Sequence, residues 1–137
     1  MATIERRKVI TGEDLLKIRE TTRSSGLKLT VKTEDEMIIQ LLKMSLGELH
    51  HSSVLFYLDG KEVLFYRWIN SSDGAIGSWV DSTALVDPYC YLCYGSVIMG
   101  GAKIGRGAHI AGGNIVRKGE VISNAALSSW GTLTEPD

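Results

Sequence analysis

The fold is decided by one repetitive stretch, residues 80–122, which reads VDSTALVDPYCYLCYGSVIMGGAKIGRGAHIAGGNIVRKGEVI. Every sixth residue of this stretch is a branched aliphatic: Val80, Val86, Leu92, Ile98, Ile104, Ile110, Val116 and Ile122. The residues two places earlier are small in the first six cases and polar in the last two: Ser78, Ala84, Cys90, Ser96, Ala102, Ala108, Asn114 and Glu120. An α-helix repeats every 3.6 residues and an ordinary strand every two, so neither imposes this pattern.

A period of six predicts a solenoid, in which each short strand delivers one aliphatic side chain to a shared interior and then turns a corner. Glycine suits such corners, where a positive φ costs other residues more. The glycines of the stretch are Gly95, Gly100, Gly101, Gly105, Gly107, Gly112, Gly113 and Gly119.

Four hexapeptides carry a family resemblance: Val-Ile-Met-Gly-Gly-Ala, Lys-Ile-Gly-Arg-Gly-Ala, His-Ile-Ala-Gly-Gly-Asn and Ile-Val-Arg-Lys-Gly-Glu. They resemble the hexapeptide-repeat family over roughly residues 75–125, about a third of the chain. The resemblance implies a left-handed parallel β-helix of triangular section, with three hexapeptides per coil and frequent assembly as a trimer. Its handedness follows from the resemblance alone, because parallel crossovers are usually right-handed. The lead-in Gly74-Ala-Ile-Gly-Ser-Trp-Val80 is similar to that of some bacterial and prophage hexapeptide proteins.

The segment before the repeat, 1–70, predicts an α+β structure with two helices and a β-hairpin. Residues 5–10 suggest a short strand, Thr11 to Gly26 a first helix, and residues 27–32 an alternating, half-buried strand. Thr33-Glu-Asp-Glu36 is a capping box that opens a second helix ending at Gly47, with Met37, Leu41 and Met44 on one face. Asp59-Gly60 between two apolar runs predicts a hairpin with a two-residue turn.

We therefore expect a mainly β chain in three parts: an N-terminal capping segment (1–70), the β-helix (71–125) and a C-terminal tail (126–137). Eight hexapeptides make fewer than three coils, which is short for a self-sufficient solenoid. The N-terminal segment is expected to bury the first coil and hide its strand edges. The tail, with Trp130, is expected to cover the other end.

Composition is that of an ordinary globular protein, with 44% hydrophobic and 23% charged residues and a formal net charge of −1. This balance gives no reason to expect nucleic-acid or membrane binding. No apolar signal core follows the N-terminus, and no apolar run approaches the roughly 20 residues that a membrane span needs. A soluble cytoplasmic or virion-associated protein without a signal peptide is expected.

The only cysteines, Cys90 and Cys93, lie inside the repeat. Redox Cys-x-x-Cys pairs use a helix N-terminus to lower the thiol pKa, and a zinc site of this type would need a second ligand pair at suitable spacing. A structural role is therefore favoured. A carbonic-anhydrase-like site needs three converging histidines, and the adjacent His50 and His51 lie far from the repeat. No metal and no cofactor are predicted.

His109 is the only histidine of the repeats, and it precedes Ile110 at a position that should face outward. The family resemblance implies acyltransferases that use a histidine base beside an acyl-CoA channel. The chain departs from those enzymes because it has few coils, no long loop interrupting the repeats and no C-terminal helix. His109 is thus a weak catalytic candidate, and the alternative function is a reduced acyltransferase that uses acyl-CoA.

Two surface features predict binding instead. Tyr89, Tyr91 and Tyr94 flank the cysteines and cannot all fit a narrow interior, so we expect an aromatic interface patch. The first coil contains only acidic charges, Asp73, Asp81 and Asp87, whereas the later coils carry basic ones: Lys103, Arg106, Arg117 and Lys118, with His109 among them. The sequence favours a non-enzymatic, self-associating β-helix protein, expected to be a homotrimer of phage, prophage or bacterial type, that binds another protein.

Overall fold

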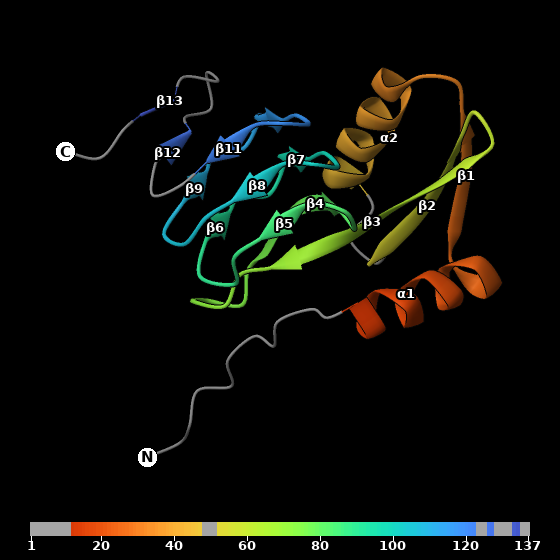
Figure 1. Ribbon diagram of the computed structural model, residues 1–137, viewed down its shortest axis with the longest axis horizontal. Helices are drawn as coiled ribbons and strands as arrows, with labels where there is room; N and C mark the ends of the chain where they lie inside the picture. The colour runs from red at the N-terminus through yellow and green to blue at the C-terminus, as the bar shows by residue number, and fades with distance from the viewer. Residues whose placement is uncertain (1–11, 48–51, 123–125, 128–132, 135–137) are drawn as a thin grey trace, which may run out of the picture.

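The computed structural model describes residues 12–47, 52–122, 126–127 and 133–134. These residues form a mainly β structure with two helices and mixed sheets, and no closed barrel occurs among them (Figure 1). The N-terminal elements are α1 (Gly12–Ser25), β1 (Leu27–Val31), α2 (Glu34–Gly47), β2 (Ser53–Leu58) and β3 (Lys61–Ile69). The repeat elements are β4 (Ile76–Asp81), β5 (Leu85–Val86), β6 (Tyr91–Leu92), β7 (Val97–Ile98), β8 (Lys103–Ile104), β9 (His109–Ile110), β10 (Ile115–Val116), β11 (Val121–Ile122) and β12 (Ala126–Leu127), followed by β13 (Leu133–Thr134).

The repeat strands pair in parallel across three sheets. Val80 pairs with Ile98 and Ile98 with Val116, so the chain returns to the same sheet after every third hexapeptide. The strands β4, β7 and β10 are neighbours in one sheet, β5, β8 and β11 in a second, and β6, β9 and β12 in a third. Seven of the eight sixth-position aliphatics are buried and the other, Val86, is half-buried, and all pack into one core. The prediction of a shared interior is confirmed.

The third sheet continues past the expected end of the repeats. β12 pairs in parallel with β9, with Leu127 opposite Ile110. The spacing of these two residues along the chain is one residue less than three hexapeptides. β13 then turns back and pairs antiparallel with β12. The expected end cap with Trp130 lies outside the described residues.

Glycine holds the later corners of the repeat. The described glycines with positive φ include one at every sixth position, with φ between 79° and 89°: Gly95, Gly101, Gly107, Gly113 and Gly119. The equivalent positions of the first coil are Thr83 and Tyr89, whose backbone N–H groups donate to the carboxylates of Asp81 and Asp87 at 2.8 Å. An aspartate that accepts a hydrogen bond two residues on forms a turn without needing a positive φ.

One of the three predicted acidic charges at the start of the repeat is buried. Asp81 is only 6% exposed, and it accepts hydrogen bonds from both the backbone and the hydroxyl of Thr83. Burial raises the pKa of Asp81, and the Thr83 hydrogen bonds and the charge of Arg19 act in the opposite direction, while Glu34 adds to the rise. Asp81 is thus a buried turn-forming group, whereas Asp73 is exposed and Asp87 is half-buried.

The hairpin joins the repeat in a single six-stranded sheet. β1 pairs in parallel with β2, β2 pairs antiparallel with β3, and β3 pairs antiparallel with β4. Asp59 (φ 49°) and Gly60 (φ 79°) form the predicted two-residue turn. β3 therefore covers the free edge of β4, as expected of a segment that hides strand edges. The predicted strand at residues 5–10 lies outside the described residues.

The helix α2 covers the outer side of the first repeat sheet. Thr33 caps it, because the N–H of Glu36 donates to Thr33 Oγ1 at 3.1 Å. Its predicted apolar face is buried and packs in one cluster with outward-facing side chains of β4 and β7. The buried members of this contact are Met37, Leu41, Met44, Trp79, Val97 and Met99. The N-terminal segment thus covers a flank of the coil, because the sheet is continuous from β1 to β10 and α2 lies along one of its faces.

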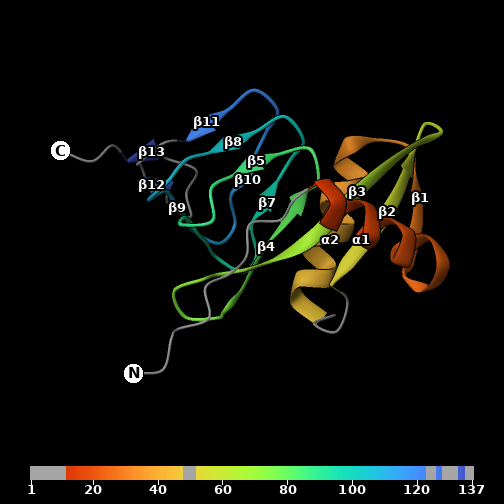
Figure 2. The same ribbon diagram turned by 60° about the horizontal axis from the view of Figure 1, so that its bottom comes forward.

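The helix α1 lies on the opposite face of the β1–β3 strands from α2, as Figure 2 shows together with Figure 1. Thr22 Oγ1 and Ser53 Oγ form a hydrogen bond of 2.8 Å, and Leu15 packs against the core of the coil. Arg19 and Arg23 both bind the carboxylate of Glu62 on β3. Neither α1 nor α2 is long and apolar enough to cross a membrane, a finding limited to the described residues.

The Asn70 side chain forms hydrogen bonds to the backbone at the free edge of β6, as a neighbouring strand would. Its amide nitrogen donates to the carbonyl of Leu92 and its amide oxygen accepts from the N–H of Leu92, both at 2.9 Å. Asn70 is 1% exposed, so it replaces a strand at a place that water does not reach.

Candidate functional site

The outer side of β6 and β9, here called the β6 face, carries a linked set of polar side chains. Tyr91 and His109 are register partners, so their rings lie side by side with centroids 5.4 Å apart. Cys93 follows β6, and its Sγ lies 3.3 Å from His109 Nε2. The Tyr91 hydroxyl donates to Asp73 Oδ2 at 2.7 Å. These contacts connect a carboxylate, a phenol, an imidazole and a thiol along one face.

The electrostatics of the face follow from these contacts. The hydrogen bond from Tyr91 lowers the pKa of Asp73, and the same bond raises the pKa of Tyr91. Burial raises the pKa of the Cys93 thiol, and the nearby charge of Asp73 adds to that rise. Burial raises the pKa of Cys90 to about 12, so this thiol stays protonated at neutral pH.

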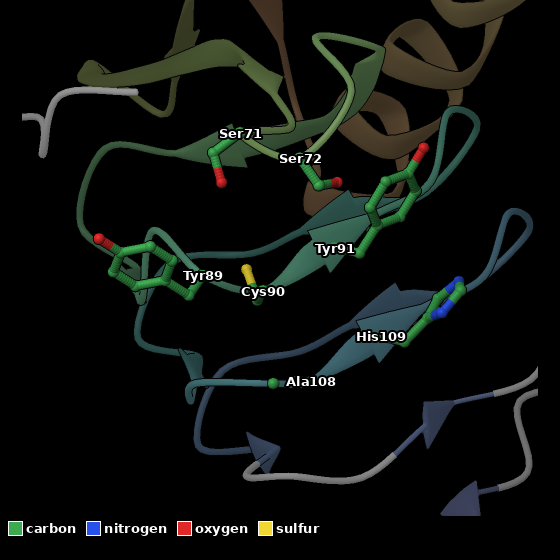
Figure 3. Close-up of a pocket in the computed structure, with 8 residues that line it drawn as sticks. Ser71, Ser72, Tyr89, Cys90, Tyr91, Ala108 and His109 are labelled. Carbon is green, nitrogen blue, oxygen red and sulfur yellow. The ribbon is translucent and has the colours of Figure 1, made fainter. Parts of the chain in front are cut away.

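A cavity of about 280 Å³ opens beside this face (Figure 3). Its lining combines hydroxyls with one thiol and the imidazole: Ser71, Ser72, Tyr89, Cys90, Tyr91, Gly107, Ala108 and His109. The Arg106 guanidinium lies 4.5 Å from the ring centroid of Tyr89, so a positive charge adjoins the cavity. The loop from Asn70 supplies the two serines, and Ser71 Oγ is fixed by donating to the carbonyl of Pro88 at 3.1 Å.

The structure gathers four of the eight predicted binding residues around this cavity: Tyr89, Tyr91, Arg106 and His109. Tyr94 stands apart from Tyr89, and its ring lies 5.7 Å from the guanidinium of Arg67. The three tyrosines therefore line two corners and the face between them, and do not form one compact patch.

The other predicted basic residues are dispersed around the coil. Lys103 lies on β8, on the sheet next to the β6 face. Arg117 pairs with Glu34 of α2 at 3.5 Å, and the aliphatic stem of Lys118 lies against Gly101. The predicted basic residues thus do not gather on one surface.

Cys93 is the site residue that the sequence reasoning missed. Three hexapeptides place equivalent residues of successive turns side by side, so the repeat predicts the Tyr91–His109 pair but gives no signal for the contact of Cys93. Cys93 reaches the same imidazole from two positions further along the chain.

The geometry gives His109 a weak case as a catalytic base. A base of this kind is oriented by an acid or a carbonyl group, but the carboxylate of Asp73 is bound by Tyr91. Within the described residues, no group of three or more His, Cys, Asp or Glu side chains could hold a metal. His50 and His51 lie outside those residues.

Comparison with models of protein families, with curated proteins and with solved structures gives no match.

Proposed function

We propose that this chain is a non-enzymatic, left-handed parallel β-helix protein of the hexapeptide-repeat type that self-associates and binds another protein. The return of the chain to the first and second sheets after every third hexapeptide and the shared aliphatic interior support the β-helix. The handedness and the expected homotrimer rest on the resemblance of the hexapeptides.

One observation carries the self-association: among the described residues, the outer side of β5, β8 and β11, here called the β5 face, exposes two large apolar side chains. Leu85 and Val121 are 64% and 63% exposed. Each pairs in register with Lys103, which lies between them on β8. The equivalent side chains of the first sheet, Trp79 and Val97, are fully buried beside α2.

The β5 face is suited to a protein contact. Full burial of a leucine or valine side chain contributes about 1.5–3 kcal/mol, and the short strands hold the two side chains in one rigid plane. Tyr89 lies between β5 and β6 along the chain and Arg106 lies between β8 and β9, so this corner adds an aromatic and a charged group at the border of the face.

Native mass spectrometry of the full chain tests this proposal. We expect a species of three times the 15.0 kDa chain mass, and we expect the double variant Leu85→Asp, Val121→Asp to be monomeric but folded. Ile39→Asp is the matched control, because Ile39 is 50% exposed on α2, away from the β5 face. A wild-type monomer at micromolar concentration, or equal disruption by Ile39→Asp, would refute self-association through this face.

A protein partner is tested by capture from extracts of the source cell. A specific partner should be lost with Tyr89→Ser or Arg106→Ser and retained with Lys61→Ser, an exposed control on β3. Capture that is equal for all of these variants would contradict binding at the corner.

The acyltransferase alternative is supported by one observation, the position of His109 in the lining of the 280 Å³ cavity. It requires acyl-CoA binding that calorimetry detects, and transfer activity that His109→Ala abolishes. Absence of heat on titration with acyl-CoA removes this alternative.

A further inference from the structure

We propose that Cys93 and His109 bind a thiophilic divalent cation, with Zn²⁺ as the reference metal, through Sγ and Nε2. Thiolate sulfur and imidazole nitrogen are the ligands that zinc prefers in proteins. This site does not depend on self-association or on the binding of another protein.

The distance between the two atoms matches the requirement of one metal ion. With a Zn–S bond of about 2.3 Å and a Zn–N bond of about 2.0–2.1 Å, two ligands of a tetrahedral ion stand about 3.5 Å apart. Cys93 Sγ and His109 Nε2 are 3.3 Å apart, so both can reach the same ion with only a small rotation of either side chain.

The two ligands are held by the coil and not by a loose loop. The N–H of Cys93 donates to the carbonyl of Ile110 at 2.8 Å, which fixes the cysteine backbone on the neighbouring strand. The His109 backbone is paired with Tyr91, whose ring packs against the imidazole. Ligands on rigid elements lose little conformational freedom when a metal binds.

The surrounding charge favours a cation. The Asp73 carboxylate accepts a hydrogen bond from the hydroxyl of Tyr91, the register partner of His109, so a negative charge lies on the same face as the pair. Since the described residues offer no third His, Cys, Asp or Glu ligand, water completes the coordination. We therefore expect weaker binding than in structural zinc sites with four protein ligands.

Titration of the full chain with Co²⁺ and Zn²⁺ tests the site. Co²⁺ should produce the near-ultraviolet thiolate-to-metal absorption of a Co–S bond, and Zn²⁺ should displace it at one ion per chain. Cys93→Ser should abolish the absorption, and His109→Gln should weaken Zn²⁺ binding by at least about tenfold, as disturbance of even an outer-shell group does.

Cys90→Ala is the matched control, because this thiol sits at a position where the repeat elsewhere accepts alanine, Ala102 and Ala108. Its absorption and Zn²⁺ affinity should equal those of the wild type, and thermal unfolding should show that all three variants are folded. A wild-type titration without the thiolate absorption, or absorption that survives Cys93→Ser, would overturn the proposal and leave the Cys93–His109 contact as a hydrogen bond only.

Discussion

Replacement of Asn70 by alanine should destabilise the fold more than any other single change in the loop before β4. The Asn70 amide group makes two hydrogen bonds of 2.9 Å to the N–H and carbonyl of Leu92. Leu92 is fully buried, and its side chain belongs to the coil interior. Asn70→Ala removes both partners at once and leaves the Leu92 backbone groups at an edge that no strand of the described residues covers.

The magnitude follows from the two orphaned groups. A buried donor or acceptor that loses its partner costs about 1–3 kcal/mol, so the loss of two partners should lower the unfolding free energy by about 2–6 kcal/mol. A domain of this size is typically stable by about 5–15 kcal/mol, so the loss should be plain in a urea titration. Asn70→Asp should also destabilise, because a carboxylate oxygen would face the Leu92 carbonyl, and this loss should grow as pH rises above about 4.

Urea unfolding and amide hydrogen exchange measure this effect. In Asn70→Ala, the Leu92 amide should lose protection, whereas the Cys93 amide, which donates to the carbonyl of Ile110, should change less. Ser71→Ala is the control, since it removes one hydrogen bond, that to Pro88, and should cost about 1 kcal/mol or less. An unfolding midpoint like that of the wild type, with unchanged Leu92 protection, would refute the role of Asn70.

Three further changes have distinct expected outcomes. Gly77→Ala should lower the unfolding free energy by about 1–3 kcal/mol, because the new Cβ would lie 2.3 Å from the Leu92 carbonyl oxygen; unchanged stability in urea would contradict this close approach. Ile98→Ala should cost about 2–5 kcal/mol as a fully buried interior residue, whereas Leu16→Ala, 60% exposed on α1, should change stability by no more than about 0.5 kcal/mol. Equal losses in these two variants would contradict the assignment of inside and outside. Burial raises the pKa of Asp81 above its unfolded value, so the wild type loses stability as pH rises from about 4 through the folded pKa. Asp81→Asn keeps an acceptor for Thr83 without the buried charge, so it should be more stable than the wild type at neutral pH and not below pH 4. A stability difference that stays constant across this pH range would argue against the buried charge of Asp81 as its cause.

The local elements were predictable because their signals are local. The period of six fixes which side chains face the interior, Asp59-Gly60 fixes the hairpin turn, and Thr33 to Glu36 marks the start of α2. The position of α2 along a flank was not predictable, since it depends on β3 pairing with β4 into one continuous sheet. The contact of α2 with β7 joins segments that are far apart along the chain, and such a contact leaves no mark in the residues of either segment alone.

The turn-forming role of Asp81 and Asp87 was not predicted, although the sequence contains the signal for it. At five later corners, the residue three places after the buried sixth-position aliphatic is a glycine. In the first coil, Thr83 and Tyr89 occupy the equivalent positions. An aspartate two residues before a corner without glycine is a turn former, so Asp81 and Asp87 could have been assigned to turns. The contact of Cys93 with His109 was beyond such reasoning, because it depends on how the imidazole leans along its strand.

The three outer faces of the coil differ in what covers them, so self-association and metal binding are proposals about two different faces. α2 covers the first face, the β5 face exposes Leu85 and Val121, and the β6 face carries the thiol and the imidazole. If copies pack through Leu85 and Val121, the Cys93–His109 pair stays open to solvent in the assembly. The double variant Leu85→Asp, Val121→Asp should therefore dissociate the oligomer and retain its Zn²⁺ affinity, while Cys93→Ser should lose the metal and retain the oligomer. Loss of both properties in either variant would mean that the two faces act as one site, and the separation of their roles would be wrong.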